Sequence, residues 1–189
     1  FNTIVNNNES IWIAQKQGRS KDGIDYTDPS VLKMIHLNVR KKQPLSNYLN
    51  NLNVVPISIS YEKDPNDIVK ARELYLTDLN AFYKKEEGED LNNIAEGIKG
   101  QKGNVSLNIG EVIYFENDSY ENAAQLITRK IKDQYLCHST NYAANIIKGK
   151  NIESNKFNED DIDQAITFLK KRLDLIPEEF HSCLLYTSD

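Results

Sequence analysis

The chain has 189 residues, of which 39% are hydrophobic and 27% charged, the balance of a globular domain with a core of its own. Its formal net charge of -5 argues against a nucleic-acid partner, because phosphate backbones are bound by a basic face. No apolar run has the length of a membrane-spanning helix, and Cys137 and Cys183 have neither metal-ligand spacing nor a disulfide pattern. We therefore expect no metal and no cofactor.

The stretch from Ser10 to Lys33 predicts a strand, a turn and a helix. The apolar run Ile11 to Ala14 has the β-branched and aromatic members that are typical of a buried strand. A turn with two glycines follows, and Asp28 then caps a helix with Pro29 in its first turn. The turn contains Arg19, which can hold a phosphate through two parallel hydrogen bonds. We interpret the stretch as a βα unit with an anion site at its mouth.

The next predicted strand is Val54 to Tyr61, in which isoleucines alternate with serines. About forty residues with helical patterning separate it from the first strand, enough for a crossover between parallel neighbours. Alternation also predicts a strand over Val105 to Ile109. The expected fold class is therefore α/β, a mainly parallel sheet flanked by helices, with the ligand site at the open end of the sheet.

Apolar residues at helical spacing predict the flanking helices at 45–52, 68–85, 91–99, 120–135 and 142–147, and a last one that begins after Asn158 or Asp160. The acidic cluster Glu86 to Asp90 is interpreted as a solvated loop rather than a metal site. The basic run Arg40 to Lys42 is either a solvated helix end or a contact with anionic lipid headgroups. His138 is assigned a structural role, because no third group completes a nucleophilic site with Cys137.

Two ordered blocks of residues carry a resemblance to a known family. Trp12-Ile-Ala-Gln-Lys-Gln-Gly-Arg-Ser-Lys-Asp-Gly23 and Val55-Pro-Ile-Ser-Ile-Ser-Tyr-Glu62 resemble the lysophosphatidic acid and glycerol-3-phosphate acyltransferases. The resemblance is strongest to a bacterial branch of 1-acyl-sn-glycerol-3-phosphate acyltransferases. A weaker likeness continues through Gly97 to Gly110 and Tyr135 to Asn145, so it covers most of the chain.

The resemblance implies roles for particular residues. The residues that match the phosphate-binding block of the family are Gln17, Gly18, Arg19, Ser20 and Lys21. Arg19 would bind the acceptor's phosphate, whereas Gln17 departs from the family, which has a glutamate at that position. Val55 and Pro56 match the block that shapes the pocket for the acyl donor.

The implied activity is transfer of an acyl group from acyl-CoA or acyl carrier protein to the free hydroxyl of 1-acyl-glycerol-3-phosphate. The enzyme would work in phospholipid biosynthesis at the cytoplasmic face of a membrane, peripherally or anchored by a segment outside this chain. A non-catalytic phosphate- or lipid-binding α/β module is the alternative.

The family's catalytic pair, a histidine with an aspartate five positions later, has no match in this sequence. The residues five positions after the three histidines are Lys41, Ala143 and Tyr186. We therefore expect the pair to lie upstream of Phe1, so that the chain is an inactive fragment. Residues 1–182 would be a partial acyltransferase domain with a helical C-terminal part, and residues 183–189 a non-native tail.

Overall fold

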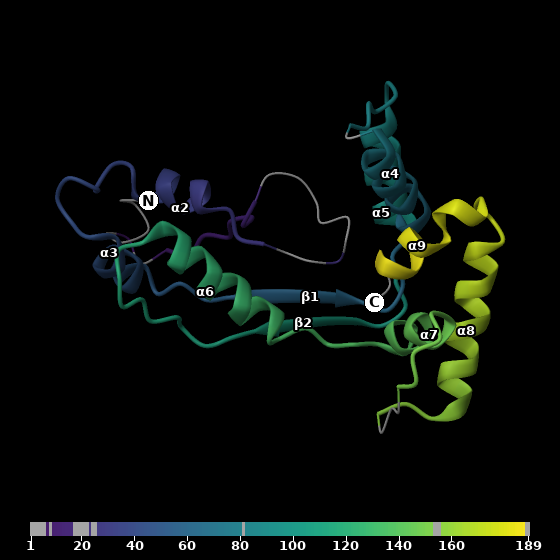
Figure 1. Cartoon of the computed structure of the whole chain (residues 1–189). Coiled ribbons are helices and arrows are strands. Elements are labelled where there is room, and N and C mark those ends of the chain that lie inside the picture. Colours follow the sequence, from purple (N-terminus) through teal and green to yellow (C-terminus); the bar gives the residue numbers. More distant parts are fainter. Residues whose placement is uncertain are drawn as a thin grey trace. The chain divides into compact units, whose positions relative to one another are not determined.

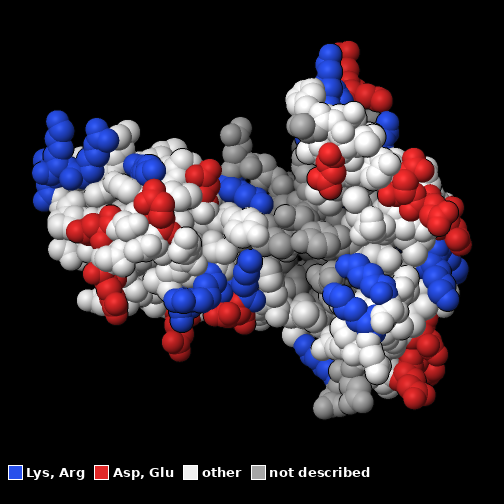
Figure 2. Space-filling view, in the orientation of Figure 1, with Lys and Arg blue, Asp and Glu red and all other residues white. Residues whose placement is uncertain are grey.

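The computed structural model describes residues 7, 9–16, 23, 26–80, 82–152 and 156–187. These residues are mostly helical and contain one two-stranded antiparallel sheet (Figure 1). The chain divides into two compact units. Unit 1 comprises Phe1–Arg19, Asp25–Ile59 and Leu107–Tyr135, and unit 2 comprises Ser20–Ile24, Ser60–Ser106 and Leu136–Asp189. On the face shown in Figure 2, basic and acidic side chains are interspersed over both units.

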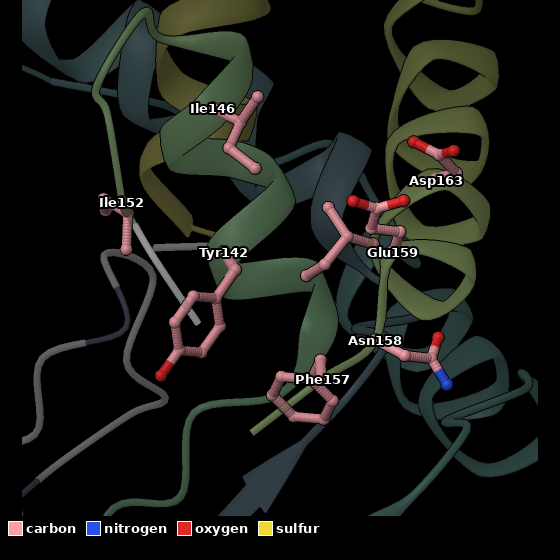
Figure 3. A pocket seen from close by; sticks show the side chains of 8 residues that line it. Tyr142, Ile146, Ile152, Phe157, Asn158, Glu159 and Asp163 are labelled. Carbon is pink, nitrogen blue, oxygen red and sulfur yellow. The ribbon is translucent and has the colours of Figure 1, made fainter. Parts of the chain in front are cut away.

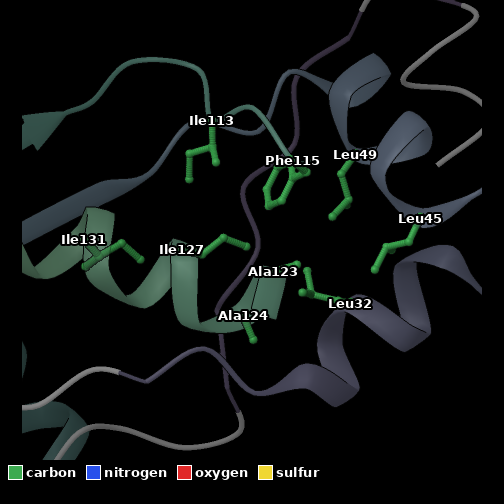
Figure 4. Packing of buried hydrophobic residues seen from close by; sticks show 9 residues of the cluster. All are labelled: Leu32, Leu45, Leu49, Ile113, Phe115, Ala123, Ala124, Ile127 and Ile131. Carbon is green, nitrogen blue, oxygen red and sulfur yellow. The ribbon is translucent and has the colours of Figure 1, made fainter. Parts of the chain in front are cut away.

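Three helices form the body of unit 1: α2 (Pro29–His36), α3 (Leu45–Leu52) and α6 (Tyr120–Lys132). Helix α6 packs against α2, and its buried residues recur at the spacing of one helical face. Figure 4 shows the side chains that converge on this core, which are Leu32, Leu45, Leu49, Ile113, Phe115, Ala123, Ala124, Ile127 and Ile131.

The predicted start of α2 is confirmed. Pro29 is the first residue of the helix, and the Asp28 side chain accepts a hydrogen bond of 2.8 Å from the Ser30 backbone N–H. An N-cap of this kind satisfies one of the amides that the first helical turn leaves without a partner. The two donors of Ser30, first its backbone N–H and then its hydroxyl, lower the pKa of the Asp28 carboxyl.

The sheet is a ribbon of β1 (Ile57–Tyr61) and β2 (Val105–Ile109). The Gly110 N–H donates to the Pro56 carbonyl, and the Glu62 N–H donates to the Asn104 carbonyl, each at 2.9 Å. These bonds run in the antiparallel sense, so the predicted mainly parallel sheet flanked by helices is wrong. Both predicted strands exist, but they pair with each other rather than with a strand at the start of the chain.

The two faces of the ribbon are the reverse of what alternation suggests. Ser58 is buried, and its hydroxyl and the Asn108 amide donate to the Gln134 carbonyl at 3.1 and 2.8 Å. The apolar residues on either side of Asn108 point outward, so that Leu107 is 56% exposed and Ile109 is 68% exposed. Polar side chains thus attach the ribbon to the end of α6, and its apolar face lies in solvent.

The strand predicted at Ile11 to Ala14 is also absent. These four residues have no regular secondary structure, and Ile11 and Trp12 are 57% and 65% exposed. A buried strand needs a partner for its backbone as well as apolar side chains. Among the described residues the segment has neither a strand partner nor a cover for these two side chains.

Unit 2 is helical. Its helices are α4 (Asp67–Asn80), α5 (Glu89–Lys99), α7 (Ser139–Ile147), α8 (Glu159–Leu173), the 3₁₀ turn η1 (Glu178–Phe180) and α9 (His181–Thr187). Helix α7 packs against α8, and α4 packs against α9. The core residues are Ala71, Ala143, Ala144, Ala165, Leu169, Leu173, Leu184 and Leu185. Asp67 at the start of α4 is buried and ion-paired with Arg172 near the end of α8.

Two helical predictions in unit 2 need correction. Helix α4 ends at Asn80 rather than near residue 85, and Phe82 beyond it is 69% exposed. The acidic stretch is only partly a loop, because Glu89 and Asp90 form the first turn of α5. No helix within the described ranges is both long and apolar enough to cross a membrane.

Candidate functional site

The five residues predicted to bind phosphate, Gln17, Gly18, Arg19, Ser20 and Lys21, lie outside the described residues. Their described neighbours are Gln15 and Lys16 on one side and Tyr26 on the other, with Gly23 between them. Gly23 has a φ of 70°, in the left-handed region that glycine adopts most readily. The other residues of the predicted turn, Gly18 to Asp22, lie outside the described residues, so the turn stays a prediction.

The two ends of this segment are joined by hydrogen bonds. The Asp28 N–H donates to the Gln15 carbonyl, and the Thr27 hydroxyl donates to the Gln15 Oε1, each at 2.8 Å. We call Gln15, Thr27 and Asp28 the loop stem. The stem therefore joins residues that lie on either side of Arg19 in the sequence.

The loop stem is also attached to α6. The Thr27 N–H donates to the Thr128 Oγ1 at 2.9 Å, although the two residues are 101 positions apart in the chain. Thr27 is only 7% exposed, so its amide has little access to water as an alternative acceptor. Thr128 in turn donates to the Ala124 carbonyl at 2.9 Å, which fixes the direction of its hydroxyl. This contact positions the loop stem on the helix.

A hollow of about 460 Å³ lies between the loop stem and α6. We call it the stem hollow. Its lining residues are Tyr26, Thr27, Pro29, Glu121, Ala124, Gln125, Thr128, Arg129, Lys132 and Asp133. It therefore combines an aromatic ring and small apolar groups with several charged side chains.

Two acidic side chains, Glu121 and Asp133, and two basic ones, Arg129 and Lys132, line the stem hollow. Glu121 is ion-paired with Lys33 at 3.3 Å, and a backbone hydrogen bond, then Lys33, lower the pKa of the Glu121 carboxyl. Arg129 and Lys132 are exposed one turn apart on α6, and the Lys132 Nζ lies 4.8 Å from the centroid of the Tyr26 ring. An arginine and a lysine at this spacing can bind one anionic group between them.

The structure places the two residues predicted for the acyl-donor pocket at the start of the ribbon. Pro56 is buried, and its carbonyl accepts the Gly110 N–H at 2.9 Å, while Val55 is 38% exposed. Pro56 fits there because that end of the ladder needs a carbonyl acceptor and not an N–H donor. Neither residue lines the stem hollow, and the residues of the phosphate-binding block lie outside the described residues.

The three histidines have structural contacts. The His36 Nδ1 lies 2.8 Å from the Tyr120 hydroxyl and its Nε2 lies 2.8 Å from the Gln43 carbonyl. His138 is buried at the N-cap of α7, with its Nε2 3.3 Å from the Ser60 carbonyl. The His181 Nε2 lies 3.1 Å from the Leu173 carbonyl. Among the described residues, none of these rings has a carboxylate partner that would orient it as a general base.

Sequence reasoning missed Tyr26, Thr27, Arg129 and Lys132 as parts of a site. A signal was present in the two cations at the end of α6, but basic residues in a last helical turn are also expected from the helix dipole alone. Comparison of the chain with family models, with curated proteins and with solved structures finds no match. Family and function therefore remain proposals that rest on the residues themselves.

Proposed function

We propose that the chain binds a phosphate monoester with an apolar tail, as the acceptor-binding part of a 1-acyl-glycerol-3-phosphate acyltransferase. The observation that carries this proposal is the stem hollow. The loop stem, whose residues flank Arg19 in the sequence, is fixed on α6 through Thr27 and Thr128, and Arg129 and Lys132 line the hollow beside it.

The chemistry of the stem hollow suits such a ligand. A phosphate monoester carries a charge of about -1.5 to -2 near pH 7, and the guanidinium of arginine matches its oxygens with two parallel hydrogen bonds. Arg129 and Lys132 supply positive charge on α6, and Arg19 would supply a further cation from the loop. Tyr26 and Pro29 offer apolar surface for the glycerol or the first carbons of an acyl chain.

In the intact parent, the free hydroxyl of the bound acceptor would attack the thioester carbonyl of acyl-CoA or acyl carrier protein. A C–O bond forms, the C–S bond breaks, and a base moves the hydroxyl proton to the departing thiolate. Val55 and Pro56 would lie near the donor. The enzyme would act at the cytoplasmic face of a membrane, attached peripherally or through a segment outside this chain, with no metal or cofactor.

A second candidate is a binding module without catalysis. The contacts of the three histidines favour it, because each ring is held by backbone or tyrosine groups rather than by a carboxylate. The two candidates share the binding of a phosphate monoester and differ in acyl transfer. An assay for thiol release from acyl-CoA by a full-length parent, run with an acceptor that is shown to bind, distinguishes them.

Binding is tested with a short-chain 1-acylglycerol-3-phosphate below its micelle concentration and with the corresponding 1-acylglycerol as its phosphate-free control. We expect the phosphate to raise the affinity at least about tenfold, since a charge-assisted contact of this kind contributes about 1.5–3 kcal/mol. Arg19→Gln and Arg129→Gln should each remove most of this preference. Lys41→Gln, in an exposed basic run outside the stem hollow, is the matched control.

In a full-length parent with measurable activity, Arg19→Ala should raise the apparent KM for the acceptor far more than the KM for the acyl donor. The reason is that Arg19 would contact the acceptor's phosphate and not the thioester. Unchanged acceptor kinetics would contradict the assignment of Arg19.

A further inference from the structure

A second hollow, of about 410 Å³, lies in unit 2 between α7 and α8 (Figure 3). We call it the α7–α8 hollow. Tyr142 and Ile146 line it from α7, and Glu159 and Asp163 line it from α8. Phe157 closes it from the segment that leads into α8. It shares no residue with the stem hollow, so what binds in it is a separate question from the proposed function.

The aromatic residues of this hollow favour a cation. The rings of Tyr142 and Phe157 meet edge to face, with centroids 5.5 Å apart and an interplanar angle of 66°. The Lys156 Nζ lies 5.9 Å from the centroid of the Phe157 ring. An ammonium group of the chain itself therefore already lies within the range at which an aromatic face attracts a cation.

The two carboxylates that line the hollow are exposed, and their only partner within the described part of the chain would be solvent. Glu159 and Asp163 are four residues apart on α8, where like charges repel each other, and neither makes a hydrogen bond or ion pair within the described part of the chain. Asp161 on the same turn is instead engaged, because it accepts the Asn158 N–H at 3.3 Å and its own N–H donates to Asn158 at 2.8 Å. Figure 2 shows the acidic side chains grouped at the start of α8.

We propose that the α7–α8 hollow binds a small alkylammonium ion. Its charged nitrogen would lie between Glu159 and Asp163, and its alkyl part would pack against Tyr142, Ile146 and Phe157. An anion is disfavoured by the two carboxylates. A divalent metal is disfavoured because apolar and aromatic walls replace the six to eight oxygen ligands that calcium requires, and no group of three or more metal-ligating side chains exists among the described residues.

The test is a titration of the isotope-labelled chain with n-butylammonium, followed by NMR shifts of α7 and α8 amides. The neutral n-butanol, of similar shape, is the control ligand. We expect n-butylammonium to bind at least about tenfold more tightly than n-butanol, with the largest shifts at the residues that line the hollow. Equal affinity of the two ligands, or no saturable binding of the ammonium, would overturn the proposal.

Charge-neutralising variants test the carboxylates. Glu159→Gln and Asp163→Asn should each weaken n-butylammonium binding about two- to fivefold, the effect of an exposed ion pair, and leave n-butanol binding unchanged. Asp160→Asn is the matched control, because it removes the same charge from the same turn without lining the hollow. These substitutions relieve repulsion, so the variants should fold. Equal weakening by Asp160→Asn would show a general effect of charge and would overturn the proposed site.

Discussion

Substitution of Thr128 by valine tests whether the contact between the loop stem and α6 holds the candidate site together. Valine keeps the shape and the β-branching of threonine but has no oxygen to accept the Thr27 N–H, which is bound at 2.9 Å in the native chain. Because Thr27 is 7% exposed, its amide would be left buried without an acceptor. The expected loss of stability is about 1–3 kcal/mol, the cost of a buried polar group without a partner.

Thr128→Ser is the control, because its hydroxyl can still accept the Thr27 N–H. The assay measures denaturant unfolding of the native chain, Thr128→Val and Thr128→Ser, and hydrogen exchange at the Thr27 amide of each. We expect Thr128→Val to destabilise unit 1 more than Thr128→Ser does, and the Thr27 amide to exchange faster only in the valine variant. The affinity for the short-chain 1-acylglycerol-3-phosphate should also fall in Thr128→Val. Unchanged exchange at Thr27 in Thr128→Val would refute the reasoning.

Three further predictions concern the rest of the chain. Arg172→Met should destabilise unit 2 by about 3 kcal/mol in denaturant unfolding, because it leaves the buried Asp67 carboxylate without its ion-pair partner; a loss below about 1 kcal/mol would contradict this role. The Ser46 backbone N–H and hydroxyl lower the pKa of the Asp118 carboxyl from its ordinary 3.8. The contribution of Asp118 to the stability of the fold is therefore present above pH 3.8 and is lost as the pH falls through the folded pKa. Asp118→Asn should flatten the acid side of a profile of stability against pH, and an unaltered acid side would contradict the contact with Ser46. Leu107→Ser, on the exposed face of the ribbon, should reduce self-association in sedimentation and binding of an apolar dye without loss of helix content, whereas unchanged dye binding would show that this face is not the apolar surface in question.

The helices could be predicted because their signals are local. The cap at Asp28 and the cap at Asn158 each lie within three residues of the amide they bind. The apolar stripe of α6 recurs at helical spacing in the sequence and is the face that lies in the core of unit 1. Signals of this range are fully contained in a short segment of sequence.

The sheet was predicted wrongly because alternation says nothing about partner or direction. The pattern of Ile57 to Tyr61 marks a strand, but its pairing with Val105 to Ile109 depends on contacts almost fifty residues away. Ser58 is buried and donates to the Gln134 carbonyl, a contact between distant residues that no local pattern encodes. The apolar run at Ile11 carried a strand signal, but among the described residues it has no strand to pair with.

In the candidate site, as in the fold, contacts between residues far apart in the chain could not be predicted from the sequence. The turn and the anion-binding role of Arg19 stay predictions, because Arg19 lies outside the described residues. The attachment of Thr27 to Thr128 could not be predicted, because it joins positions 101 residues apart through a single side-chain oxygen. Arg129 and Lys132, which line the stem hollow, fell within a predicted helix but were not predicted to belong to a site.

The measurement that tests the account most directly is the ratio of affinities for a short-chain 1-acylglycerol-3-phosphate and its phosphate-free counterpart, in the native chain and in Arg19→Gln. The account predicts a ratio of at least about ten for the native chain and a ratio near one for the variant. A native ratio near one would contradict the proposal that the chain binds the acceptor's phosphate. A ratio that Arg19→Gln leaves unchanged would contradict the role assigned to Arg19.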